Sequence, residues 1–204
     1  MAMEWQTPYS RGFNTSFGYL GGGEDHYTQA GMQQEWGCFG TDLWNTRGPA
    51  YGTNGTYAAY LYNSEALRII KEHPEPEVNP LFVYLATQTM HAPVQVPSYW
   101  SDMYRSDTYT KTYAVSNGMA TVTDSILGNV SLALQQRRMW NHTLIVHLSD
   151  NGGPVWKHMA SHANNFPLCA PHCSPSAHAA YRCSAIAFNE FLAFGQAGRE
   201  ALQF

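Results

Sequence analysis

The segment that decides the fold covers residues 144–153 and reads Leu-Ile-Val-His-Leu-Ser-Asp-Asn-Gly-Gly. Its first half is apolar and β-branched, which predicts a buried strand that brings Asp150 and Asn151 to its carboxyl end. Open α/β sheets bind their ligands at that end. A carboxylate and a neighbouring amide oxygen suit a hard cation such as calcium. Because Asp, Asn and Gly are also ordinary turn formers, an Asx-type turn without a ligand is the alternative.

Helical and strand patterns alternate on the N-terminal side of this segment. Apolar residues recur at intervals of three and four over residues 57–72, which predicts an amphipathic helix ended by the prolines that follow. Residues 81–86 predict a second buried strand, with His91 just past its end. A second helical stripe covers residues 115–133. The order helix, strand, helix, strand predicts a parallel α/β sheet, with His91 and the Asp150–Asn151 pair on one edge.

Both ends of the chain depart from this alternation. Residues 1–56 are rich in glycines, aromatic residues and turn formers without regular periodicity, which indicates a long ordered loop or short strand pieces. No further alternation of strands and helices follows residue 168, and residues 188–194 form an apolar run without a clear partner. We therefore expect a partial sheet domain over residues 1–168 and a poorly ordered tail over residues 169–204.

The composition and the lengths of the apolar runs argue against a nucleic-acid-binding protein and against a membrane-spanning protein. The 204 residues are 44% hydrophobic and 14% aromatic, which is typical of a globular chain. Only 11 Lys and Arg residues and a net charge of −4 argue against nucleic-acid binding. The sequence predicts neither a membrane span nor a signal peptide at Met1. Four N-glycosylation acceptor patterns nevertheless indicate the secretory pathway, and they begin at Asn14, Asn54, Asn129 and Asn141.

Several separate motifs occur in an order that points to one family. They include Arg-Gly-Phe at residues 11–13, Glu-Asp-His-Tyr at 24–27, Met-His-Ala-Pro at 90–93 and Ser-Asp-Asn-Gly-Gly at 149–153. Together they resemble the sulfatase family of the alkaline-phosphatase-like fold, most closely its arylsulfatase B branch, over about residues 4–168. Asp25 and His26 belong to one of these motifs, and we interpret them as residues that stabilise a loop.

The resemblance implies a partial alkaline-phosphatase-like α/β fold, incomplete at both ends, in a calcium-dependent sulfuric ester hydrolase. Asp150 and Asn151 would be ligands of one calcium ion, and His91 would contact the sulfate or protonate the departing alcohol. Sulfated carbohydrates such as glycosaminoglycans, or aryl sulfates, would be the substrates, and the lysosome or the extracellular space the location. Asn151 favours a sulfatase over the zinc phosphoesterases of this fold, which carry histidine beside the aspartate.

Two departures from the family's motifs keep a second function open. The family's formylglycine nucleophile segment, C-x-P-S-R, is absent, and its nearest match at residues 173–177 lacks the arginine. After Leu168 the family's R-G-G-K segment is replaced by Cys-Ala-Pro-His. The alternative is therefore a catalytically inactive sulfatase-like chain, with too few calcium ligands, that acts at most as a binding or regulatory fragment.

Overall fold

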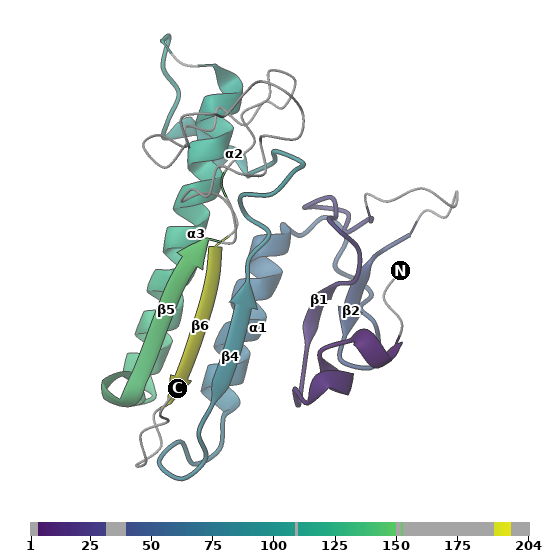
Figure 1. Ribbon diagram of the computed structural model, residues 1–204. Coiled ribbons are helices and arrows are strands. Elements are labelled where there is room, and N and C mark those ends of the chain that lie inside the picture. Colours follow the sequence, from purple (N-terminus) through teal and green to yellow (C-terminus); the bar gives the residue numbers. More distant parts are fainter. Residues whose placement is uncertain (1–3, 32–39, 109, 150–151, 153–189, 197–204) are drawn as a thin grey trace, which may run out of the picture. The chain divides into compact units, whose positions relative to one another are not determined.

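The computed structural model describes residues 4–31, 40–108, 110–149, 152 and 190–196 (Figure 1). The chain divides into two compact units, Met1–Glu65 and Ala66–Phe204. Each unit contains a three-stranded sheet, in the order β1-β2-β3 in the first and β4-β6-β5 in the second. The fold is therefore mixed α/β, as the sequence predicts.

The first unit is built from short pieces, in agreement with the missing periodicity of its sequence. Two 3-10 helices, η1 (Glu4–Gln6) and η2 (Tyr9–Arg11), precede β1 (Phe17–Tyr19), β2 (Leu43–Asn45) and β3 (Gly48–Pro49). The three strands pair antiparallel. Leu43 of β2 is 1% exposed and belongs to the core of this unit.

Helix α1 (Ala58–Glu72) begins in the first unit and ends in the second. Its buried apolar residues recur at intervals of one to four positions along one stripe, as expected for an amphipathic helix: Ala58, Ala59, Tyr62, Ala66 and Ile70. The helix ends one residue before His73, which precedes a proline and so is disfavoured in helical conformation.

The sheet of the second unit contains β4 (Phe82–Ala86), β5 (Thr143–Ser149) and β6 (Glu190–Gln196). The strand β6 lies between the other two and pairs antiparallel with both, so β4 and β5 run parallel to each other (Figure 1). Alternate residues of β4 and β5 remain exposed on one face of the sheet, including Phe82 at 62% and Leu144 at 63%. Leu85 of β4 is buried, so the two faces of this strand differ.

Helix α3 (Lys111–Gln136) carries the main buried stripe of the second unit. The buried side chains of the stripe recur at helical spacing and are nearly all apolar: Ala114, Met119, Val122, Thr123, Ile126, Val130 and Leu134. Thr110 caps the helix, because its hydroxyl accepts a hydrogen bond of 3.3 Å from the Tyr113 N–H. The end of α3 is joined to the end of α1, since Arg137 Nη2 donates to the His73 carbonyl over 2.5 Å.

A short helix, α2 (Ser98–Asp102), packs closely against α3 at Gly118. A Cβ at this position would lie 3.0 Å from both the Ser101 nitrogen and the Trp100 carbonyl carbon. Only glycine allows the two backbones to approach this closely. A further 3-10 helix, η3 (Trp140–His142), leads from α3 into β5.

Several features of the second unit differ from the sequence-based expectation. The predicted parallel sheet is antiparallel at both of its pairings, because β6 lies between β4 and β5. These two strands, predicted to be buried, keep alternate side chains exposed. The sequence predicts no strand after residue 168, whereas the apolar run near residues 188–194 contributes β6, whose partners are β4 and β5. The short helix α2 was also not predicted. Among the described residues, no helix has the length and hydrophobicity that a membrane span requires. The proposed division at residue 168 stays a prediction.

Candidate active site

The carboxyl ends of β4 and β5 lie level with each other at one edge of the second unit's sheet. Ala86 of β4 and Leu148 of β5 both pair with Phe191 of β6. Neighbouring strands are about 4.8 Å apart, so the two outer strands end at the same height with a separation of about 10 Å. The loop that carries His91 therefore leaves the sheet at the same edge as the segment that follows β5.

The two predicted calcium ligands, Asp150 and Asn151, follow the last residue of β5 directly in the sequence. β5 ends at Ser149, and Asp150 is the next residue. Asp150 and Asn151 lie outside the described residues, so their role as ligands stays a prediction. The strand that precedes them is the one the sequence predicts, and it runs toward the edge from which the His91 loop leaves.

His91 is half-buried in a turn that follows β4 by five residues. Its backbone N–H donates to the Gln88 carbonyl over 2.9 Å, which closes the turn. Its Nδ1 lies 2.8 Å from the Ala92 carbonyl oxygen. Because a carbonyl oxygen only accepts hydrogen bonds, Nδ1 carries the hydrogen in this contact. This contact corresponds to the tautomer with its hydrogen on Nδ1, in which Nε2 is an acceptor.

Three buried threonines hold the start of the His91 loop. The Thr89 hydroxyl lies 2.9 Å from Thr87 Oγ1 and 2.5 Å from Thr123 Oγ1 on α3. Thr87, Thr89 and Thr123 are 6%, 0% and 4% exposed. We call these residues the hydroxyl cluster. It joins the end of β4 to the middle of α3.

Nowhere in the described residues do three or more His, Cys, Asp or Glu side chains gather in a way that could hold a metal ion. Calcium takes six to eight oxygen ligands. Asp150 and Asn151 have the right chemistry for part of that set.

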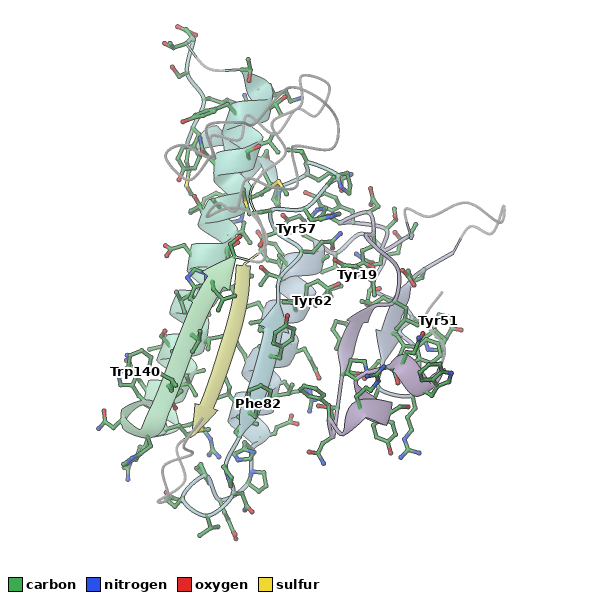
Figure 2. All side chains as sticks on the ribbon, viewed as in Figure 1. Tyr19, Tyr51, Tyr57, Tyr62, Phe82 and Trp140 are labelled. Carbon is green, nitrogen blue, oxygen red and sulfur yellow. The ribbon has the colours of Figure 1, made fainter. Side chains whose placement is uncertain are left out.

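A second buried polar cluster lies in the first unit, at the start of α1. Tyr62 of α1 is labelled in Figure 2. It donates a hydrogen bond of 2.6 Å to Glu24 Oε1, and both side chains are buried. Burial raises the pKa of Glu24 from its ordinary 4.5 to about 7, the Tyr62 hydrogen bond lowers it, and the charges of Asp42 and Asp25 raise it. We call Glu24 and Tyr62 the carboxyl cluster.

The loop that contains Asp25 and His26 is stabilised by these two residues, as the sequence predicts. Asp25 Oδ1 accepts hydrogen bonds from the Tyr27 N–H at 3.0 Å and the Thr28 N–H at 2.8 Å, which is an Asx turn. The His26 ring is fully buried and stacks on Tyr57 with ring centroids 5.5 Å apart. These contacts support the loop-stabilising role of both residues.

The four glycosylation asparagines are all exposed. Asn14 and Asn54 lie in loops of the first unit, Asn129 lies on α3, and Asn141 lies in η3. Their exposure makes each of them accessible to modification. Glycosylation itself stays a prediction.

Sequence reasoning missed the residues that hold His91. Thr123 falls among the apolar residues of the α3 stripe, where a threonine reads as an ordinary helix position. Thr89 is separated from it by 34 residues. The only sequence clue was a buried-stripe position occupied by a hydroxyl residue, and buried hydroxyls require partners.

Comparison with known proteins identifies the family. Residues 3–178 match the Sulfatase family, and the chain belongs to it. Arylsulfatase J of Mus musculus is 34% identical over 164 residues, which are 79% of this chain and 26% of that protein. An arylsulfatase of Klebsiella aerogenes is 29% identical over 108 residues, which are 53% of this chain and 23% of that protein. The chain thus spans about a quarter of the length of these relatives.

Solved structures support the same fold. The crystal structure of Ps i-CgsB in complex with k-i-k-neocarrahexaose matches with a TM-score of 0.71 and 22% identity, over 95% of this chain and 42% of that one. The crystal structure of Ps i-CgsB alone matches with a TM-score of 0.68 and 24% identity, over the same shares of the two chains. The chain therefore has the α/β fold of part of a larger domain.

Proposed function

We propose that this chain is part of the catalytic domain of a sulfuric ester hydrolase, with sulfated carbohydrates or aryl sulfates as substrates. The observation that carries the proposal is the common edge at which β4 and β5 end. The loop that carries His91 leaves the sheet at this edge, and the sequence Asp-Asn-Gly-Gly follows Ser149 of β5 along the chain. Membership of the sulfatase family and the likeness to two arylsulfatases support it.

His91 would act as the proton donor or as a sulfate contact. Hydrolysis breaks the bond between sulfur and the alcohol oxygen, and negative charge collects on that oxygen as the bond breaks. With Nδ1 held by the Ala92 carbonyl, an imidazolium would donate the proton from Nε2 to the departing oxygen. The same Nε2–H could instead donate a hydrogen bond to a sulfate oxygen.

Asp150 and Asn151 would hold a calcium ion, together with ligands from outside the described residues. Bound there, the ion would neutralise negative charge on the sulfate oxygens. The resemblance also implies a formylglycine nucleophile, whose C-x-P-S-R motif does not occur in residues 1–204. We expect weak calcium binding by these 204 residues, which isothermal titration would measure.

The location we propose is the lysosome or the extracellular space. The support is the likeness to arylsulfatases and the exposure of all four acceptor asparagines. In a secretory expression host, we expect glycosidase treatment to lower the apparent mass of the protein. No change in mass would count against this location.

The alternative proposal is that residues 1–204 are catalytically inactive and act at most as a binding or regulatory fragment. The missing nucleophile motif favours this for the chain on its own. We expect no turnover of an aryl sulfate by residues 1–204. Turnover at the rate of a complete sulfatase would contradict the alternative.

The test of the enzymatic proposal is aryl sulfate hydrolysis by the natural gene product that contains these residues. We expect His91→Gln to lower kcat by roughly 100- to 10,000-fold, the usual contribution of a general acid. The control is His142→Gln, because His142 is exposed and precedes the opposite end of β5. Equal activity of both variants would contradict the role of His91. An inactive natural gene product would favour the alternative.

A further inference from the structure

The hydroxyl cluster has one consistent direction of hydrogen bonding. A threonine hydroxyl has a single hydrogen, so each member has one main acceptor. Thr89 donates to Thr87 over 2.9 Å. The contact of 2.5 Å between Thr89 and Thr123 then requires Thr123 to be the donor. The chain of donors runs from α3 through Thr89 to the end of β4.

Thr123 occupies a place where an apolar side chain would otherwise be expected. It lies within the buried stripe of α3, next to Val122, and is 4% exposed. Its other acceptor, the Met119 carbonyl one turn back, is 3.4 Å away. A contact of 2.5 Å is far shorter, so Thr89 is the main partner of this hydroxyl. The buried hydroxyl is thus explained by a contact to the loop and not by helix formation.

The position of Thr89 determines where the His91 turn lies. Because the His91 N–H donates to the Gln88 carbonyl, Thr89 is the first of the two central residues of that turn. The imidazole of His91 is hydrogen-bonded to the carbonyl of the next residue, Ala92. A displacement of Thr89 would therefore move the backbone of the turn and the ring together.

We propose that Thr123 is a positioning residue for His91, and that it acts by holding Thr89 in place from α3. The catalytic meaning of this role rests on the proposed function of His91. The physical link from Thr123 to the imidazole does not depend on it. The link can therefore be tested by the signals of His91 itself, without turnover.

The experiment compares variants of the full chain that differ in the hydroxyl at residue 123. Thr123→Val replaces the hydroxyl by a methyl group, whereas Thr123→Ser keeps it. We expect T123V to shift the His91 ring resonances in NMR and to speed exchange of the His91 amide by about 5- to 10-fold. T123S should restore both signals toward those of the original chain.

Thr121→Val is the matched control on the same helix. The Thr121 hydroxyl bonds to the Asn117 carbonyl at 2.9 Å and to the Tyr104 hydroxyl at 2.5 Å, away from the hydroxyl cluster. We expect T121V to leave the His91 resonances unchanged. If T123V does not fold, Thr123→Ala and Thr123→Ser form a second pair that differs by one oxygen atom.

Two results distinguish failure of the link from failure of the proposed function. If folded T123V or T123A leaves the His91 resonances as they were, Thr123 is only a stabilising residue and the proposal is overturned. If those resonances shift but His91→Gln leaves aryl sulfate turnover unchanged, the link stands and the proposed function fails.

Discussion

The two units of the chain bury polar side chains in chemically different ways. The carboxyl cluster of the first unit contains an ionisable acid, Glu24, whose pKa is raised to about 7 by burial. The hydroxyl cluster of the second unit contains only threonines, which do not titrate between pH 4 and 9. The difference predicts that pH acts on the stability of the fold through the first unit. The packing that holds His91 should be insensitive to pH.

The largest effect we expect is the loss of stability as the pH rises. The folded protein keeps the Glu24 proton up to about pH 7, whereas the unfolded chain releases it near 4.5. The stabilisation is therefore fully present below pH 4.5 and is lost as the pH rises through 7. The difference between the pKa of Glu24 in the folded and in the unfolded chain corresponds to roughly 3 kcal/mol of stability. Urea unfolding between pH 4.5 and 8 measures it.

Glu24→Gln should remove most of this pH dependence, because the amide does not ionise. Glu77→Gln is the control, since Glu77 is exposed on the loop before β4. An unchanged slope in E24Q would show that another group carries the pH dependence.

The next largest effect is the loss of stability that we expect when the Tyr62 hydroxyl is removed. Tyr62→Phe deletes the hydrogen bond of 2.6 Å to Glu24, and we expect a cost of about 1–3 kcal/mol. That hydrogen bond lowers the pKa of Glu24, so its loss should move the pH-dependent decrease in stability to higher pH. Tyr51→Phe, at a position that is 82% exposed, is the control. Equal unfolding free energies for Y62F and Y51F would be inconsistent with the carboxyl cluster.

A smaller effect of a different kind is expected in the hydroxyl cluster. Thr89→Val should cost about 1–2 kcal/mol, because it leaves the Thr123 hydroxyl without its main partner. The cost should be the same at pH 5 and pH 8. The double variant T89V/T123V should be more stable than the sum of the two single costs predicts. A cost that changed with pH would remove the contrast between the two clusters.

The smallest effect is expected at Thr121. Its contact with the Tyr104 hydroxyl is exposed, so Thr121→Val should change the unfolding free energy by less than about 0.5 kcal/mol. Chemical unfolding of T121V and T89V in parallel compares a half-buried hydroxyl with a fully buried one. Equal costs would mean that burial does not decide the strength of these contacts.

The parts of the fold that could be predicted are those with local periodicity. The spacing of apolar residues predicts α1, β4, α3 and β5 to within a few residues, because helix and strand periods are properties of neighbouring positions. The relative direction of β4 and β5 also follows from the order of elements. The strand β6 could not be placed, since its partners lie about 40 residues or more away along the chain.

At the candidate site, too, residues in local motifs could be predicted, whereas contacts between distant parts of the chain could not. His91 was found because it follows a strand within a recognisable motif. Thr89 and Thr123 were not, because their contact joins a loop to a helix 34 residues further on. The sequence likewise marks Glu24 only as part of a motif. Its buried hydrogen-bond partner, Tyr62, lies on α1, 38 residues further along the chain.

The central claim is that His91 and the segment after Ser149 lie at one edge of the sheet. It is tested most directly by a spin label on Asp150→Cys, in a chain whose four native cysteines are replaced by serine, with NMR detection of the histidine rings. The ends of β4 and β5 are about 10 Å apart, whereas the length of β5, about 23 Å, separates its carboxyl end from the end that His142 precedes. We predict that the label broadens the His91 signal strongly and the His142 signal much less. A sharp His91 signal beside a broadened His142 signal would contradict the account.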